Sequence, residues 1–202
     1  MNLNYQKIKK WFFLFSPILI YLLFFNKYFF GNTYLFGFSE WYNPYSLDHL
    51  KDYLFQSLFL YSDNNWGIPQ YYPVINIFNG ERVLISSIFG IILGQKIIVL
   101  SYFYFSFLAC FLFTEKIIKN YKLSFILALI FSFNPFILNH FVFGHTVLII
   151  SMYHLLFSGY FLIKFYENKN KKNLILTIIF FSINPIHPLY ISFYLFFYLL
   201  IG

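Results

Sequence analysis

The sequence predicts an all-α fold, a polytopic bundle of transmembrane helices with a long loop on one side of the membrane. Of its 202 residues, 60% are hydrophobic and 27% aromatic, only 10% are charged, and the mean hydropathy is +0.66. A soluble domain carries about 25% charged residues, whereas each bilayer crossing needs about 20 mostly apolar residues. Several such runs follow one another along the chain. We therefore expect about six spans within one transmembrane domain, residues 1–202.

The first span is expected from about Trp11 to Phe29. Lys7, Lys9 and Lys10 precede it, so the start resembles a signal sequence. No small-residue cleavage site follows the apolar run, which favours an uncleaved signal anchor.

The next apolar segment, Val83 to Gly94, is too short to cross a bilayer. It ends at Gly94-Gln95-Lys96, and we expect a re-entrant or interfacial helix that leads into a true span. The remaining spans are expected at Ile97 to Phe113, Leu123 to Phe143, Thr146 to Ile163, Leu174 to Asn184, and Pro188 to Ile201.

The lysines predict the orientation, because cytoplasmic loops of membrane proteins are enriched in Lys and Arg. Clusters occur before the first span and between later spans, at Lys7, Lys9 and Lys10, at Lys116, Lys119 and Lys122, and at Lys164, Lys169, Lys171 and Lys172. If each run crosses once, all three clusters fall on the same side. We therefore expect a multi-pass protein of the cytoplasmic membrane, with the N-terminus in the cytoplasm and the loop 31–96 outside.

Two segments near the predicted outer surface are almost duplicates. Phe131 to Phe136 and Phe181 to Ile186 both fit the pattern Phe-Ser-x-Asn-Pro, at an offset of 50 residues. Proline cannot donate the helical hydrogen bond and disfavours helix in the residue before it. Each Asn-Pro is therefore expected to break or end its span, with Asn satisfying the freed backbone groups. The pattern fits either a recurring helix stop or an internal structural repeat.

Composition excludes several classes of protein. The net charge of +7 does not predict nucleic-acid binding, because the lysines sit in short clusters between apolar runs. Cys110 is the only cysteine, which excludes disulfides and Cys-based metal sites. No His pair has the spacing of a helical zinc site. His154 lies about nine residues, or roughly 13 Å, below His145, and at that depth it is expected to face the bundle interior or a cavity.

The acidic residues point to the outer loop as the functional region. Five of the seven fall there, namely Glu40, Asp48, Asp52, Asp63 and Glu81. A loop of roughly 60 residues needs its own structure or a function. Ser46 to Tyr61 predicts an amphipathic helix on the outer membrane surface, with Leu47, Leu50, Leu54 and Leu58 on one face. The segment around Trp66 predicts a coil over the bundle that lines a cleft for a sugar or a lipid headgroup.

Within this loop, three groups carry candidate chemistry. Glu40 lies among aromatic residues, where burial raises the pKa of a carboxyl group and suits a general base; the alternative is a solvated loop acid. Asp48 and Asp52 are one turn apart and offer oxygen ligands for a divalent cation, or they form a solvated helix face. Arg82, the only arginine, either meets a phosphate or pairs with Glu81.

The pattern as a whole resembles the N-terminal part of a GT-C glycosyltransferase. The residues that carry this resemblance are Glu40, Trp66-Gly67-Ile68-Pro69, and Asn134-Pro135 followed by Gly144-His145. The family transfers a sugar from a polyprenyl-phosphate carrier to an acceptor outside the cytoplasmic membrane, typically with an acid of the first outer loop as general base. Members commonly have Asp where this chain has Glu40, and more spans. The resemblance thus implies the N-terminal portion of a longer enzyme, or a minimal or degenerate member.

The resemblance implies a role for each candidate residue. Glu40 would activate the acceptor hydroxyl, and Asp48 or Asp52 would assist it or hold Mg²⁺ or Mn²⁺. The substrate-binding residues would be Trp66, Arg82, His140, His145 and His187, with Arg82, His140 and His145 at the carrier's phosphate. The partners implied are membrane lipid and a polyprenyl-phosphate-linked sugar of the cell envelope, and not nucleic acid.

Two other functions remain open from the sequence. Broken helices and a histidine inside a span are also features of transporters and lipid-handling proteins. A non-catalytic membrane subunit is the third interpretation.

Overall fold

The computed structural model describes residues 3–31, 46–48, 51, 75–142 and 146–182, and this part of the chain contains helices and no strand. The predicted all-α fold is therefore confirmed for the described residues. The longer helices, in chain order, are α1 (Leu3–Phe24), α2 (Asn26–Phe30), α4 (Ile75–Phe89), α5 (Ile91–Ile118), α6 (Tyr121–Ser132), α7 (Pro135–Val142), α8 (Thr146–Asn168) and α9 (Lys171–Ser182).

Three helical stretches in the described residues are long and apolar enough to cross a membrane. They are Ile91–Ile118, Tyr121–Asn139 and Ile149–Asn168, and Phe12–Phe24 is a shorter apolar helix. These apolar helices indicate a membrane protein. The described part of α9 has 12 residues, short of a span, and the predicted span Pro188 to Ile201 lies outside the described residues. The described helices thus account for three of the expected spans.

The first predicted span, Trp11 to Phe29, was wrong as a single helix. The chain leaves helical geometry at Phe25, with φ −101° and ψ 32°, and α2 begins at Asn26. The Asn26 side-chain amide donates a hydrogen bond to the Leu23 carbonyl at 2.9 Å. Asparagine side chains compete in this way with the regular ladder of backbone hydrogen bonds, which explains a break that hydropathy alone does not reveal.

The boundary predicted at Gly94-Gln95-Lys96 was also wrong, because the break lies at Gly90. Gly90 has φ +78°, a conformation that glycine adopts without steric cost. Gly94 lies inside α5, and a Cβ there would come within 2.7 Å of the Ser86 Cα. This glycine therefore lets the first turns of α5 pack directly on the backbone of α4.

The break predicted at Asn134-Pro135 is confirmed. Helix α6 ends at Ser132 and α7 begins at Pro135. The Asn134 side chain donates to the Phe131 carbonyl at 2.7 Å and accepts from the Ile137 N–H at 2.9 Å. One side chain thus closes the first helix and caps the second, which is the role expected for it from the sequence.

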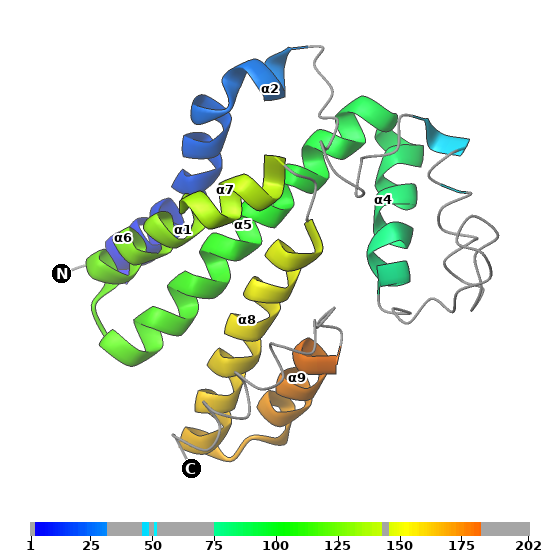
Figure 1. Ribbon diagram of the computed structural model, residues 1–202. Coiled ribbons are helices and arrows are strands. Elements are labelled where there is room, and N and C mark those ends of the chain that lie inside the picture. The colour runs from blue at the N-terminus through cyan, green and yellow to red at the C-terminus, as the bar shows by residue number, and fades with distance from the viewer. Residues whose placement is uncertain (1–2, 32–45, 49–50, 52–74, 143–145, 183–202) are drawn as a thin grey trace.

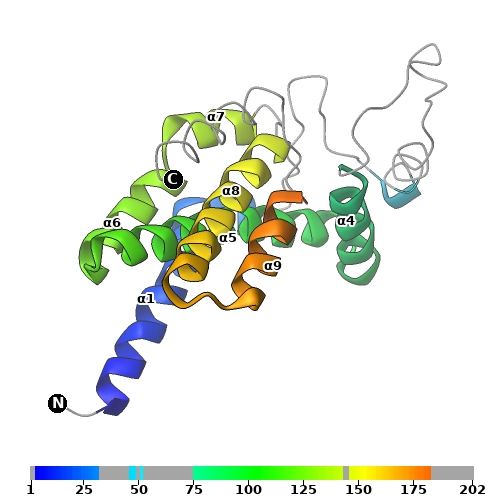
Figure 2. The ribbon, with the colours of Figure 1, turned by 90° about the horizontal axis from the view of Figure 1, so that it is seen from below.

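Helix α5 is the centre of the bundle. In Figure 1, α1 and α6 lie on one side of it and α8 and α9 on the other, and both views place α4 at its N-terminal end (Figures 1 and 2). Phe105 contacts Tyr153 with ring centroids 5.9 Å apart, and Lys116 pairs with Glu167 farther along both helices. The contacts advance in the same direction on both helices, so α5 and α8 run parallel, and the turns that follow them lie at the same end of the bundle.

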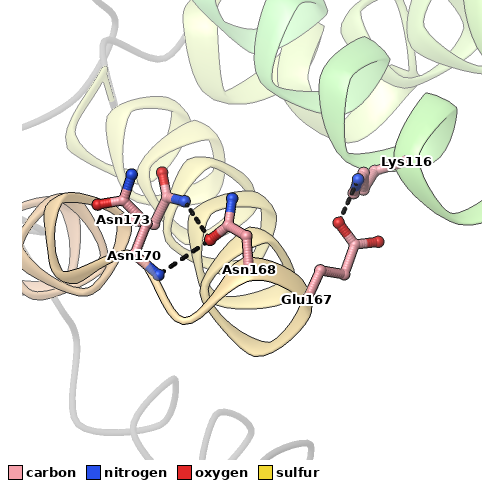
Figure 3. A network of polar contacts seen from close by, with 5 residues as sticks. All are labelled: Lys116, Glu167, Asn168, Asn170 and Asn173. Atoms are coloured by element: carbon pink, nitrogen blue, oxygen red, sulfur yellow. Dashed lines mark hydrogen bonds and ion pairs between the residues drawn. The ribbon is translucent and has the colours of Figure 1, made fainter.

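The chain contains an internal repeat of helical hairpins, longer than the Asn-Pro segments indicate. Helix α5 ends at Ile118 and α8 at Asn168, and α6 and α9 each begin three residues later. Lys119 and Lys169 follow with φ 56° and 54°. Asn120 and Asn170 then accept hydrogen bonds from backbone N–H groups at 3.1 and 2.9 Å. Figure 3 shows the second turn, where Asn168 also accepts from Asn173.

Candidate functional site

A cleft opens at the end of the bundle opposite the two turns, where α2 meets the junction of α4 and α5. It has a volume of about 590 Å³ and is open to the surroundings. Its walls come from the C-terminal end of α2 and from the residues on both sides of Gly90, namely Phe29, Phe30, Gly31, Phe89, Gly90, Ile91, Ile92, Leu93 and Lys96. All of these except Lys96 are apolar or glycine, so the cleft suits an apolar chain next to one positive charge.

Lys96 holds α2 against α5. Its ammonium group donates hydrogen bonds to the carbonyl oxygens of Phe29, at 3.2 Å, and of Gly31. It also lies 5.8 Å from the centre of the Tyr28 ring. The carbonyls at a helix C-terminus carry partial negative charge, so a cation there is stabilised although only 7% of Lys96 is exposed. An ammonium group has three donors, and two are used by these carbonyls.

A second set of polar groups lies deeper, between α4 and α5. Arg82 and Glu81 of α4 lie near the hydroxyl of the buried Tyr102 on α5 and act on it electrostatically. Burial raises the pKa of the half-buried Glu81, and the neighbouring Arg82 charge partly offsets that rise. Ser86 and Gln95 are also buried at this junction. The Arg82 charge thus acts on both Glu81 and Tyr102, and Arg82 is not among the residues that line the cleft.

Of the predicted catalytic acids, Asp48 is the one that the structure describes. Leu47, Asp48 and Lys51 are helical, and the rest of the helix predicted from Ser46 to Tyr61 lies outside the described residues. The Asp48 carboxylate is 91% exposed and lies 3.7 Å from the Lys51 ammonium. This environment fits a solvated helix face better than a cation site. Glu40 and Asp52 lie outside the described residues.

The histidines and Trp66 are mostly outside the described part as well. His140 lies in α7, two residues before the end of that helix, whereas Trp66, His145 and His187 are not described. His154 is 7% exposed and packs against Tyr153 and Phe180, with ring centroids 4.7 and 5.7 Å away. Its predicted orientation toward the interior is confirmed. Among the described residues no three His, Cys, Asp or Glu side chains gather as metal ligands would.

Sequence reasoning missed the cleft and the role of Lys96. The signal was a lysine next to Gly94-Gln95 at the start of an otherwise apolar run, which we interpreted as a boundary between segments. Its partners, the carbonyls of Phe29 and Gly31, are 67 and 65 residues away along the chain. A pattern among neighbouring residues does not reveal contacts between residues so far apart in the sequence.

No protein-family model matches the chain, and comparison with curated proteins and with solved structures finds no significant similarity.

Proposed function

We propose that the chain is an integral membrane glycosyltransferase of the GT-C kind, which transfers a sugar from a polyprenyl-phosphate carrier on the extracytoplasmic side. In this proposal about six spans cross the cytoplasmic membrane, the N-terminus lies in the cytoplasm, and the loop 31–96 lies outside with an interfacial helix in it. The observation that carries the proposal is the apolar cleft with the buried cation Lys96 in its wall.

The cleft has the chemistry that a lipid phosphate requires. Its aromatic and aliphatic walls suit an isoprenoid chain, and burial of apolar surface contributes roughly 25 cal/mol per Å². Among the described residues, two carbonyls accept from Lys96, and in this proposal its third donor meets a phosphate oxygen. The same ammonium would stabilise the charge that develops on the phosphate as it leaves the sugar.

The proposed reaction uses the loop that starts at the cleft. Glu40 follows Gly31 by nine residues, which span at most about 30 Å, so its carboxylate can reach the cleft. In the proposed step Glu40 takes the proton of the acceptor hydroxyl, whose oxygen bonds to the anomeric carbon. The bond from that carbon to the carrier's phosphate oxygen breaks, and polyprenyl phosphate leaves. Because Asp48 is exposed and paired with Lys51, no step is assigned to a metal ion.

The test uses the full chain in lipid nanodiscs with a polyprenyl-phosphate hexose that is radiolabelled in the sugar. We expect Glu40→Gln to bind the lipid as the unchanged protein does but to lose sugar release. We expect Lys96→Met to weaken lipid binding at least tenfold, and Lys27→Met, at an exposed lysine of α2, to leave it unchanged. Leu93→Trp narrows the cleft without removing a charge and should also weaken binding. Normal binding and release in all four variants would contradict the proposal.

A lipid transporter is the second candidate, favoured by the polar groups buried between α4 and α5. Ser86 and Gln95 are buried there, with the half-buried Arg82 beside them, and polar residues inside a membrane bundle often mark a pathway. A fluorescent polyprenyl phosphate in proteoliposomes separates the two functions. Movement of that lipid between leaflets, unchanged by Glu40→Gln and without sugar release, would favour transport.

A further inference from the structure

Both turns of the hairpin repeat contain a lysine in a left-handed backbone conformation, and this combination does not in itself stabilise a protein. Lys119 and Lys169 both adopt left-handed backbone geometry, with φ 56° and 54°. For a residue with a Cβ this geometry costs roughly 1 kcal/mol, and Gly or Asn adopts it more readily. Strained positions persist where they have a function or where neighbours compensate for the strain. The recurrence of lysine at both positions therefore calls for an explanation.

Positive charge gathers around these turns. Between residues 115 and 172 there are seven lysines and two glutamates, a net charge of +5, at Lys116, Lys119, Lys122, Lys164, Lys169, Lys171 and Lys172 against Glu115 and Glu167. Because α5 and α8 run parallel, the lysines of both turns lie at one end of the bundle. The ion pair between Lys116 and Glu167 joins the two hairpins there (Figure 3).

Aromatic rings beside the lysines indicate the layer in which the charges lie. The Lys164 ammonium is 5.2 Å from the centre of the Tyr160 ring, and the Lys169 ammonium is 5.1 Å from that of Tyr166. Lysine side chains extend their apolar stems along such rings and place the charge at the water boundary. Tyr and Trp are enriched at the membrane–water interface. Since these turns end apolar helices, the surface that the lysines face is the headgroup layer of the bilayer.

From this arrangement we propose that the turns at residues 119–122 and 169–172 form one binding surface for anionic phospholipid headgroups. Each basic residue next to an anionic membrane surface contributes about 1 kcal/mol. The five exposed lysines, Lys119, Lys122, Lys169, Lys171 and Lys172, therefore give the protein a preference for an anionic leaflet. This inference does not depend on the proposed glycosyltransferase activity.

Lysine at a helix C-terminus also stabilises the helix dipole, so the test must separate lipid binding from helix stability. The double variant Lys119→Asn with Lys169→Asn removes two charges, and Asn accepts the left-handed geometry. Lys27→Asn with Lys51→Asn removes two exposed lysines away from the turns and is the matched control. Lys119→Arg with Lys169→Arg keeps the charge.

The full chain in detergent is mixed with phosphatidylglycerol or phosphatidylcholine, and native mass spectrometry measures how much of each lipid binds. We expect the unchanged protein, the control and the Arg variant to prefer phosphatidylglycerol, and added salt to weaken that preference. Loss of two lysines at about 1 kcal/mol each should weaken phosphatidylglycerol binding about 30-fold. Equal binding of both lipids to the unchanged protein, or unweakened binding by the Asn variant, would overturn the proposal. An equal loss in the control would overturn it too.

Discussion

The hairpins α5–α6 and α8–α9 have nearly identical turns but very different surroundings. Helix α6 buries Ser124, Ala128 and Ser132 completely. The positions 50 residues later lie on α9, where Ile178 is 55% exposed and Ser182 is also exposed. The difference arises from α1, which packs on the first hairpin and, among the described helices, has no counterpart beside the second.

The contacts of α1 explain how the first hairpin is buried. Phe13 packs on Phe125, with ring centroids 5.0 Å apart, and the Tyr21 hydroxyl donates to Ser132 at 2.7 Å. Ser132 in turn donates to the Ala128 carbonyl. Small residues on α6 leave room for these contacts, whereas α9 carries Ile178 at the matching place. Turn geometry therefore follows the local sequence, but burial depends on which helix happens to be adjacent.

Substitutions at the matched positions 128 and 178 should give the largest difference between the hairpins in the free energy of unfolding. Ala128→Ile inserts extra atoms into a fully buried site, and overpacking of this kind costs roughly 1–3 kcal/mol. Ile178→Ala at the exposed position should change the free energy of unfolding by less than about 0.5 kcal/mol. Unfolding by SDS in mixed micelles measures both. Equal costs would show that the two faces are buried alike.

Removal of the Asn134 side chain should have the next largest effect. Asn134→Ala loses the hydrogen bonds to Phe131 and from Ile137, and we expect destabilisation by roughly 1–2 kcal/mol. The same unfolding assay measures it, and Asn139→Ala, near the end of α7, serves as the control. An effect no larger than that of the control would contradict the capping role.

Loss of the capping asparagine should lower the free energy of unfolding by the same amount in both turns. Asn120→Ala and Asn170→Ala each remove one capping bond to a backbone N–H. Each change should cost about 1 kcal/mol, and the two costs should agree within about 0.5 kcal/mol. Clearly unequal costs would mean that the two turns have the same geometry but contribute differently to stability.

The sequence predicted features that depend on nearby residues and missed those that depend on distant ones. The break at Asn134-Pro135 followed from the chemistry of two adjacent residues, and the interior position of His154 followed from the cost of placing an ionisable group in lipid. By contrast, the break at Gly90 was predicted four residues too late. Both Gly90 and Gly94 offer the backbone freedom that a break needs, and the packing on Ser86 that keeps Gly94 in the helix is not local.

The candidate site was harder to predict than the fold for the same reason. The sequence around Lys96 predicts only a boundary between two segments. Its role becomes visible in the fold, where the carbonyls of Phe29 and Gly31 accept its hydrogen bonds. Arg82 was identified as a candidate, but its contact with Tyr102 of α5 depends on how α4 folds back along the bundle. Asp48 was identified as a candidate, and its carboxylate is exposed and paired with Lys51.

The smallest expected effect concerns Glu81 of α4, whose charge acts on Tyr102 of the first hairpin and on Tyr153 of the second. Because burial raises the pKa of Glu81, the folded protein keeps this proton at pH values where the unfolded chain has lost it. Its contribution to stability is therefore full below the ordinary glutamate pKa and declines as pH rises through the raised value. Thermal unfolding followed across this range should show the decline, and Glu81→Gln should flatten it. If the stability of the Glu81→Gln variant declined with pH as that of the unchanged protein does, Glu81 would not be the cause of the decline.

The central claim is that the lysine-bearing turns and the acidic loop lie on opposite faces of a membrane. Single cysteines at Lys51 and at Lys122, both exposed side chains at these two places, test it in intact cells with a membrane-impermeant maleimide. The native Cys110 is buried within α5 and serves as the background. The account predicts that Lys51→Cys is labelled from outside and that Lys122→Cys is labelled only after the membrane is opened. Labelling of both from outside, or of Lys122→Cys alone, would contradict it.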